Sequence, residues 1–184
     1  MKNALSGFIS RLSQAVRGRS SVNQGSTTIK PNDDTLLYSR KLVELFDSVM
    51  ILDKTIYAMI HSETNQNTRD ALTGLRILAL KRKQEFFERI AEIYEFTYTL
   101  DEMRGLVSFL ESANGKAIKS KQEAAMRRER DAPSAIYTPG EQKALTAFLA
   151  SPAGQATKKK QPIVEDGIRD EVNEFLKILM DEAG

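Results

Sequence analysis

The most constraining feature of the sequence is a short repeat in its C-terminal half. The segment 98–117 returns 39 positions later as 137–156, and each copy opens with Tyr-Thr-x-x-Glu and continues through Phe-Leu and Ser to a Gly. Because a repeat of this kind encodes one supersecondary unit per copy, the two copies are expected to form similar units. The motif residues are Thr99, Glu102, Phe109, Ser112 and Gly115 in the first copy, and Thr138, Glu141, Phe148, Ser151, Pro152 and Gly154 in the second.

Each copy carries the signals that start a helix. In a capping box, the hydroxyl of Ser or Thr accepts a bond from the third backbone amide of the helix, and a Glu at that third position bonds back to the first residue. Thr99 with Glu102, and Thr138 with Glu141, have this spacing. The sequence therefore predicts a short helix after Thr99 and another after Thr138.

Each copy also carries the signals that end this helix and start a second one. Ser112 and Ser151 are suited to cap the next helix, and Pro152 stands where a first helical residue loses nothing by lacking an N–H group. Each copy is therefore predicted to be a bent helical hairpin. In it, the phenylalanine faces inward and the glycine lets another backbone approach closely.

Apolar residues recur at spacings of three and four over the rest of the chain after residue 32. This period predicts one long helix over 32–62, a second over about 68–96 that pairs with it as an antiparallel hairpin, and a last helix over 162–181. No stretch of four or more residues alternates between apolar and polar side chains, as a half-buried strand would. The predicted fold is all-α: a bundle of about five to seven helices, with two related helical hairpins in the C-terminal half.

The composition restricts the chemistry that the chain can perform. It contains no Cys and one His, which excludes disulfides, thiol nucleophiles, zinc ribbons and any site with two imidazoles. Glu85, Glu88, Glu92 and Glu95 share a helical stripe, but no Glu-x-x-His accompanies them, so a solvated face is predicted. No catalytic, metal-binding or cofactor-binding residue is therefore predicted.

Residues 1–32 form a distinct basic leader. They contain five basic residues and no acid, which leaves the remaining chain mildly acidic and argues against a nucleic-acid partner. The leader then becomes rich in Gly, Ser and Thr, so we expect it to be flexible, with residues 33–184 forming a single helical domain. Its first half has the spacing of an amphipathic helix that could touch a membrane surface through Leu5, Phe8, Ile9 and Leu12, with Arg11 and Arg17 on the other side.

The second copy of the repeat resembles the motif of an uncharacterised bacterial family, DUF2059. The shared pattern is an aromatic-Thr-x-x-Glu start, an inward Phe and a Ser-Pro-x-Gly step before a Lys-rich helix, and a weaker similarity extends over 35–182. The resemblance implies an all-helical, mostly exported protein without an assigned activity, and thus a periplasmic location. The sequence shows no secretory signal, which leaves the cytoplasm or another export route as alternatives.

Three functional hypotheses follow. The first is a non-catalytic helical scaffold or protein-interaction protein of the bacterial envelope or an export pathway, with a protein partner or a second copy as its ligand. The second is a peripheral membrane protein that uses the basic leader. The weakest is a hydrolase with a carboxylate pair such as Asp101 and Glu102, which first-turn stabilisation of a helix explains better.

Overall fold

The computed structural model describes residues 33–127 and 136–183, so the leader 1–32 lies outside the described residues. Every regular element in the two described ranges is a helix, which confirms the predicted all-α fold. Arg82 alone separates α4 from α5, and counting these two as one bent helix gives a number within the predicted range. The helices are α2 (Asp33–Phe46), α3 (Met50–Ser62), α4 (Gln66–Lys81), α5 (Lys83–Thr97), α6 (Leu100–Glu111), α7 (Ala113–Arg127), α8 (Pro139–Ala150) and α9 (Pro152–Ala183).

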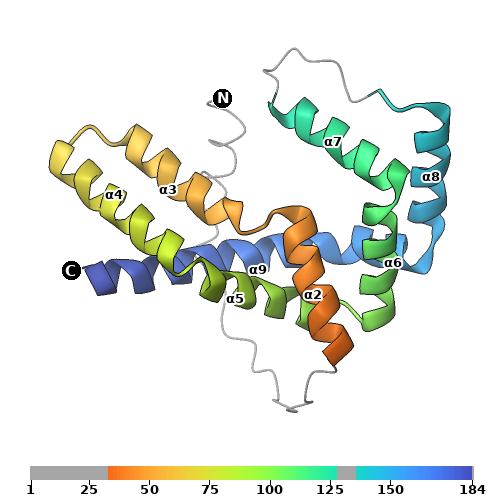
Figure 1. The fold of residues 1–184 in the computed structure, drawn as a ribbon, viewed down its shortest axis with the longest axis horizontal. Helices are drawn as coiled ribbons and strands as arrows, with labels where there is room; N and C mark the ends of the chain where they lie inside the picture. Colours follow the sequence, from red (N-terminus) through yellow and green to blue (C-terminus); the bar gives the residue numbers. More distant parts are fainter. Residues whose placement is uncertain (1–32, 128–135, 184) are drawn as a thin grey trace.

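Helix α9 is the strut of the molecule and runs along most of its length (Figure 1). The α3–α4 arm lies at one end, and α6, α7 and α8 gather at the other, with α2 crossing between them. Helix α5 packs on α9, and α2 packs on both α5 and α6. The core centres on Phe86 and Phe175, which are fully buried and whose ring centroids lie 5.1 Å apart.

The prediction of one long helix over 32–62 is wrong, because the chain turns sharply at Asp47. Asp47 has a φ of 52°, and the Ser48 amide donates to the Val43 carbonyl at 3.1 Å. Together with a bond from the Asp47 amide to the Glu44 carbonyl at 3.1 Å, this is a Schellman ending of α2. The usual sequence signal for a Schellman ending is a glycine. Because this chain has aspartate at that position, the sequence does not indicate that the helix ends there.

The turn at Asp47 also limits the predicted antiparallel hairpin to α3 and α4. The guanidinium of Arg76 on α4 donates two hydrogen bonds to the Asp53 carboxylate on α3, at 2.6 and 3.0 Å. Helix α2 turns away from this arm and crosses α5 instead, where the Ser48 and Tyr94 hydroxyls lie 3.2 Å apart. Because of this break, the amphipathic segment 33–62 packs on two different parts of the molecule: α2 on α5 and α6, and α3 on α4.

Two further helix boundaries differ from the prediction. The expected helix over 68–96 is interrupted at Arg82, whose guanidinium bonds to Glu85 and Glu182. The expected last helix at Pro162 begins earlier, at Pro152, and Pro162 lies inside it. A proline inside a helix costs about 3 kcal/mol, so its position usually marks a helix start. Here the packing of α9 against α4, α5, α6 and α8 maintains the helix.

We expect the substitution Asp47→Gly to raise the free energy of unfolding by about 0.5 kcal/mol, because glycine adopts a positive φ without the steric cost of a Cβ atom, which outweighs its greater freedom in the unfolded chain. Asp47→Val should lower it, since β-branched side chains tolerate this region least. Urea unfolding of the three proteins checks this. Equal stability of Asp47→Gly and the parent chain would show that the turn holds no strain.

Candidate functional site

The two repeats form two hairpins, α6–α7 and α8–α9, each with a complete capping box. In the first, the Thr99 amide donates to Glu102 at 2.8 Å and the Glu102 amide donates to the Thr99 hydroxyl at 3.4 Å. The matching distances for Thr138 and Glu141 are 2.7 and 3.2 Å. The local sequence therefore sets the start of α6 and of α8 in the same way.

The corner of each hairpin depends on a serine and a glycine. The hydroxyl of Ser112 accepts a bond from the Gly115 amide at 3.0 Å, and Ser151 does the same for Gly154 at 3.1 Å. A Cβ atom at Gly115 would lie 1.9 Å from the carbonyl oxygen of Phe109. Each second helix can therefore start against the end of the first only because its third residue lacks a side chain.

The two hairpins contact each other reciprocally. The rings of Phe109 and Phe148 stack with centroids 4.1 Å apart and planes inclined by 8°. Lys160 of the second hairpin donates to Glu102 of the first at 2.6 Å, and Lys121 of the first donates to Glu141 of the second at 2.6 and 2.9 Å. Helix α6 packs on α9 as α7 packs on α8. Because exchanging the copies maps each contact onto another, we infer an approximate two-fold axis through the phenylalanine pair.

Both capping carboxylates are shifted toward the ionised state. The hydrogen bond from Lys121, with help from the Thr138 amide, lowers the pKa of Glu141 below its ordinary value. Burial by itself would raise the pKa of Glu102, but the hydrogen bonds from Lys160 and Thr99 outweigh burial and lower it. Each carboxylate thus joins its own helix start to the opposite hairpin.

We expect the stability of the domain to fall as these carboxylates are protonated. Since their pKa is lower in the folded than in the unfolded state, the stabilisation is complete above the ordinary pKa and is lost as pH falls through the folded value. Glu141→Gln should be less stable than the parent chain at about pH 7, and the two should converge as pH falls below the folded pKa of Glu141. Urea unfolding across this range measures the effect, and a gap that is independent of pH would contradict it.

A groove lies on the two-fold axis, between α7 and α9. It has a volume of about 690 Å³, and its lining is mostly apolar. Four lining positions have no counterpart one repeat distance away in the groove: Phe46 of α2, Gly115 of α7, and Pro162 and Glu165 of α9. The other lining positions are pairs separated by the repeat distance: Leu106 and Leu145, Phe109 and Phe148, Leu110 and Leu149, Ile118 and Thr157, Lys119 and Lys158, and Gln122 and Gln161.

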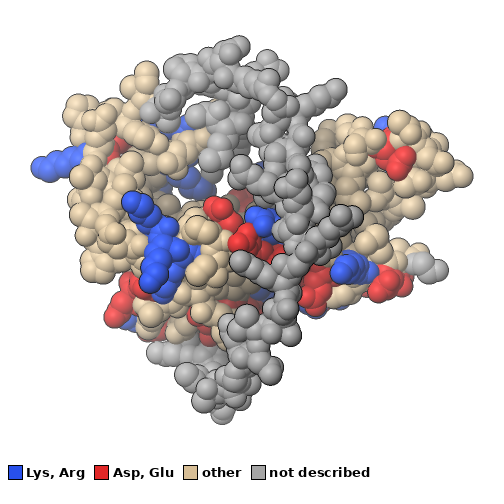
Figure 2. Space-filling view, turned by 180° about the vertical axis from the view of Figure 1, so that it is seen from behind, with Lys and Arg blue, Asp and Glu red and all other residues tan. Residues whose placement is uncertain are grey.

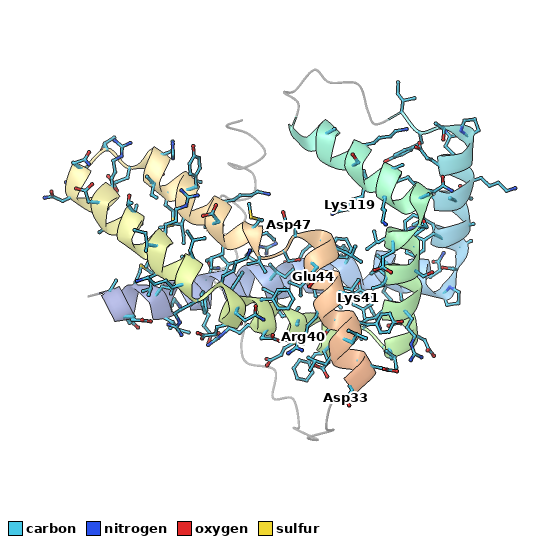
Figure 3. All side chains as sticks on the ribbon, viewed as in Figure 1. Asp33, Arg40, Lys41, Glu44, Asp47 and Lys119 are labelled. Carbon is cyan, nitrogen blue, oxygen red and sulfur yellow. The ribbon has the colours of Figure 1, made fainter. Side chains whose placement is uncertain are left out.

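The groove and the contact between the hairpins use residues that the sequence motif did not single out. Lys121 and Lys160, and the lining lysines Lys119 and Lys158, lie after the motif ends in each copy. The repeat distance of 39 residues relates each pair and could have identified them. Figure 3 shows Lys119 on the side of α7 that faces α2. The repeat thus continues farther along α7 and α9 than the motif indicates.

Among the carboxylates of the metal and hydrolase alternatives, four have ionic partners: Glu85, Glu88, Asp101 and Glu102. In the stripe on α5, Glu85 pairs with Arg82 and Arg89, and Glu88 pairs with Arg40. Asp101 is exposed beside Arg104, whereas the neighbouring Glu102 points to Lys160 and its own cap. The structure therefore does not bring these carboxylates together around one reacting centre.

The membrane alternative rests on Leu5, Phe8, Ile9, Leu12, Arg11 and Arg17, which lie outside the described residues. Within residues 33–127 and 136–183, none of the helices combines the length and apolar content needed to cross a bilayer.

Comparison with known proteins gives a match to a protein family. No curated protein and no solved structure matches the chain significantly. The model of the bacterial family DUF2059, described as an uncharacterized protein conserved in bacteria, matches residues 84–132. This segment contains most of α5 and all of α6 and α7, so the match lies on the first copy of the repeat, whereas the motif that resembles the family lies in the second. The predicted family similarity is thereby confirmed: over residues 84–132 this chain is similar to DUF2059.

Proposed function

We propose that this chain is a non-catalytic helical interaction protein, and that the groove between its repeats receives an apolar segment of a protein partner. The observation that carries the proposal is the groove itself, which is lined at one place by apolar side chains from both repeats. Its volume of about 690 Å³ is typical of a binding site rather than of a packing defect. Leu149, with 43% of its surface exposed, is one of the lining residues.

The rigid surroundings support a binding role. Stacked rings, two ion pairs and two capped helix starts fix the floor and walls of the groove, and a preorganised site loses less entropy on binding. The two capping carboxylates beside the groove, Glu102 and Glu141, are used in these contacts, which argues against a catalytic role for them. The similarity to DUF2059 supports a bacterial setting for this interaction, and the envelope or an export pathway is the setting that we propose.

An environment-sensitive apolar dye tests whether the groove is open to ligands. We expect the dye to bind the native chain, with its fluorescence lost in Leu149→Glu, because the new carboxylate would be desolvated by an apolar occupant. Ile77→Glu is the matched control, since Ile77 is a similarly exposed side chain on α4, 53% exposed and outside the groove. Equal dye binding by both variants and the parent would refute the groove as the site.

A further inference from the structure

The partner of the groove can be specified further from the charge of its walls. Residues 113–122 of α7 contain three lysines and no acid, and the equivalent residues 152–161 of α9 also contain three lysines and no acid. Among these lysines, Lys121 and Lys160 form ion pairs with Glu141 and Glu102, and Lys119 also has a polar or electrostatic interaction. Lys119 and Lys158, one on each wall, line the groove. Figure 2 shows basic side chains gathered on the end of the molecule that holds α8 and the start of α9.

The form of the walls favours a helical partner. Both walls are α-helices, so their backbone N–H and C=O groups are already bonded within the helix. An extended peptide would find few backbone partners there, whereas a helix satisfies its own backbone groups and can lay an apolar face into the groove.

From these observations we propose that the groove binds an amphipathic helix of a partner protein whose apolar face is flanked by acidic residues. The apolar face would rest on Phe109 and Phe148, and its acidic flanks would meet Lys119 on one wall and Lys158 on the other. Opposite charges at the rim of an interface select the partner and speed its association. This inference rests on the proposed function, because it names the partner of the same groove.

The charge of the walls also argues against this chain's own leader as the occupant. Residues 1–32 carry five basic residues and no acid, so the lysines on both walls would repel them. Glu165 is the acidic side chain among the lining residues, one helical turn beyond Gln161 on α9. Glu165 could attract one positive charge of an occupant, whereas Lys119 and Lys158 would both repel positive charges.

Two synthetic peptides test the proposal. Both form a helix of about four turns with leucine on one face; one has glutamate on the remaining positions and the other lysine. We expect the full chain to bind the glutamate peptide about tenfold more tightly than the lysine peptide, measured by fluorescence anisotropy at low salt. The double variant Lys119→Glu, Lys158→Glu should reverse this preference.

The control variant changes the net charge equally at a distance from the groove. It is Lys143→Glu with Lys177→Glu, two exposed positions that do not line the groove, and it should retain the preference for the glutamate peptide. Equal binding of both peptides that is still lost in Leu149→Glu would overturn the acidic partner and leave the proposed function intact. If neither peptide binds, or if the fatty acid laurate occupies the groove and the glutamate peptide does not displace it, the helical partner is refuted.

Discussion

Gly154→Ala is expected to destabilise the domain by about 3 kcal/mol, although it adds a single methyl group. A Cβ atom at this position would lie 2.0 Å from the carbonyl oxygen of Phe148 and 2.7 Å from its carbonyl carbon. These are backbone atoms at the end of α8, so they cannot move aside as a flexible side chain would. The α8–α9 corner would have to open, and the groove beside it would lose its shape.

The chain provides two matched comparisons for this substitution. Gly115→Ala should behave in the same way, because its Cβ atom would meet the Phe109 carbonyl in the equivalent corner. Gly74→Ala should instead stabilise the protein by about 1 kcal/mol, since this exposed position within α4 has no atom within 4 Å of a new Cβ. Thermal and urea unfolding measure the stability of the three variants. Equal stability of all three would contradict the close backbone contact at the two corners.

Phe148→Ala is the second substitution with a large expected effect, a loss of about 3 kcal/mol. It removes one of the two stacked rings on the axis between the repeats and leaves the Phe109 ring without its partner. The loss should fall at the lower end of the usual range for phenylalanine, because Phe148 is only partly buried. Phe109→Ala should have a similar effect on the free energy of unfolding.

Phe96→Ala is the appropriate control for these two variants. Phe96 is 86% exposed, so its truncation should change the free energy of unfolding by less than about 0.5 kcal/mol. If Phe148→Ala changed the free energy of unfolding as little as this control, the phenylalanine pair would not stabilise the contact between the repeats. Its remaining role would be to contact a ligand in the groove.

The helical class and the design of each repeat could be read from the sequence because local interactions specify them. A capping box needs only residues three positions apart, and the corner glycine acts within six positions of Phe148. The same local reasoning failed where tertiary packing overrides it. Pro162 signals a helix start, yet α9 continues through it because neighbouring helices cover most of its length.

The groove could not be derived from periodicity. Apolar spacing identifies the buried face of each helix, but it does not show that two hairpins meet about an axis or that a space remains between them. The reciprocal pairing of Glu102 with Lys160 and of Glu141 with Lys121 depends on this arrangement. The break at Asp47 was missed for a different reason, since aspartate is an uncommon residue in the left-handed conformation and gives no clear sequence signal.

Mapping of amide chemical shifts by NMR, with the leucine and glutamate peptide added to the full chain, tests the central claim most directly. If the groove between the repeats is the binding site, shifts should appear together on both walls, around Ile118 to Gln122 on α7 and Thr157 to Gln161 on α9. The α3–α4 arm, with its exposed Ile77 and Leu80, should remain unaffected. Shifts confined to that arm, or to one wall alone, would contradict the account.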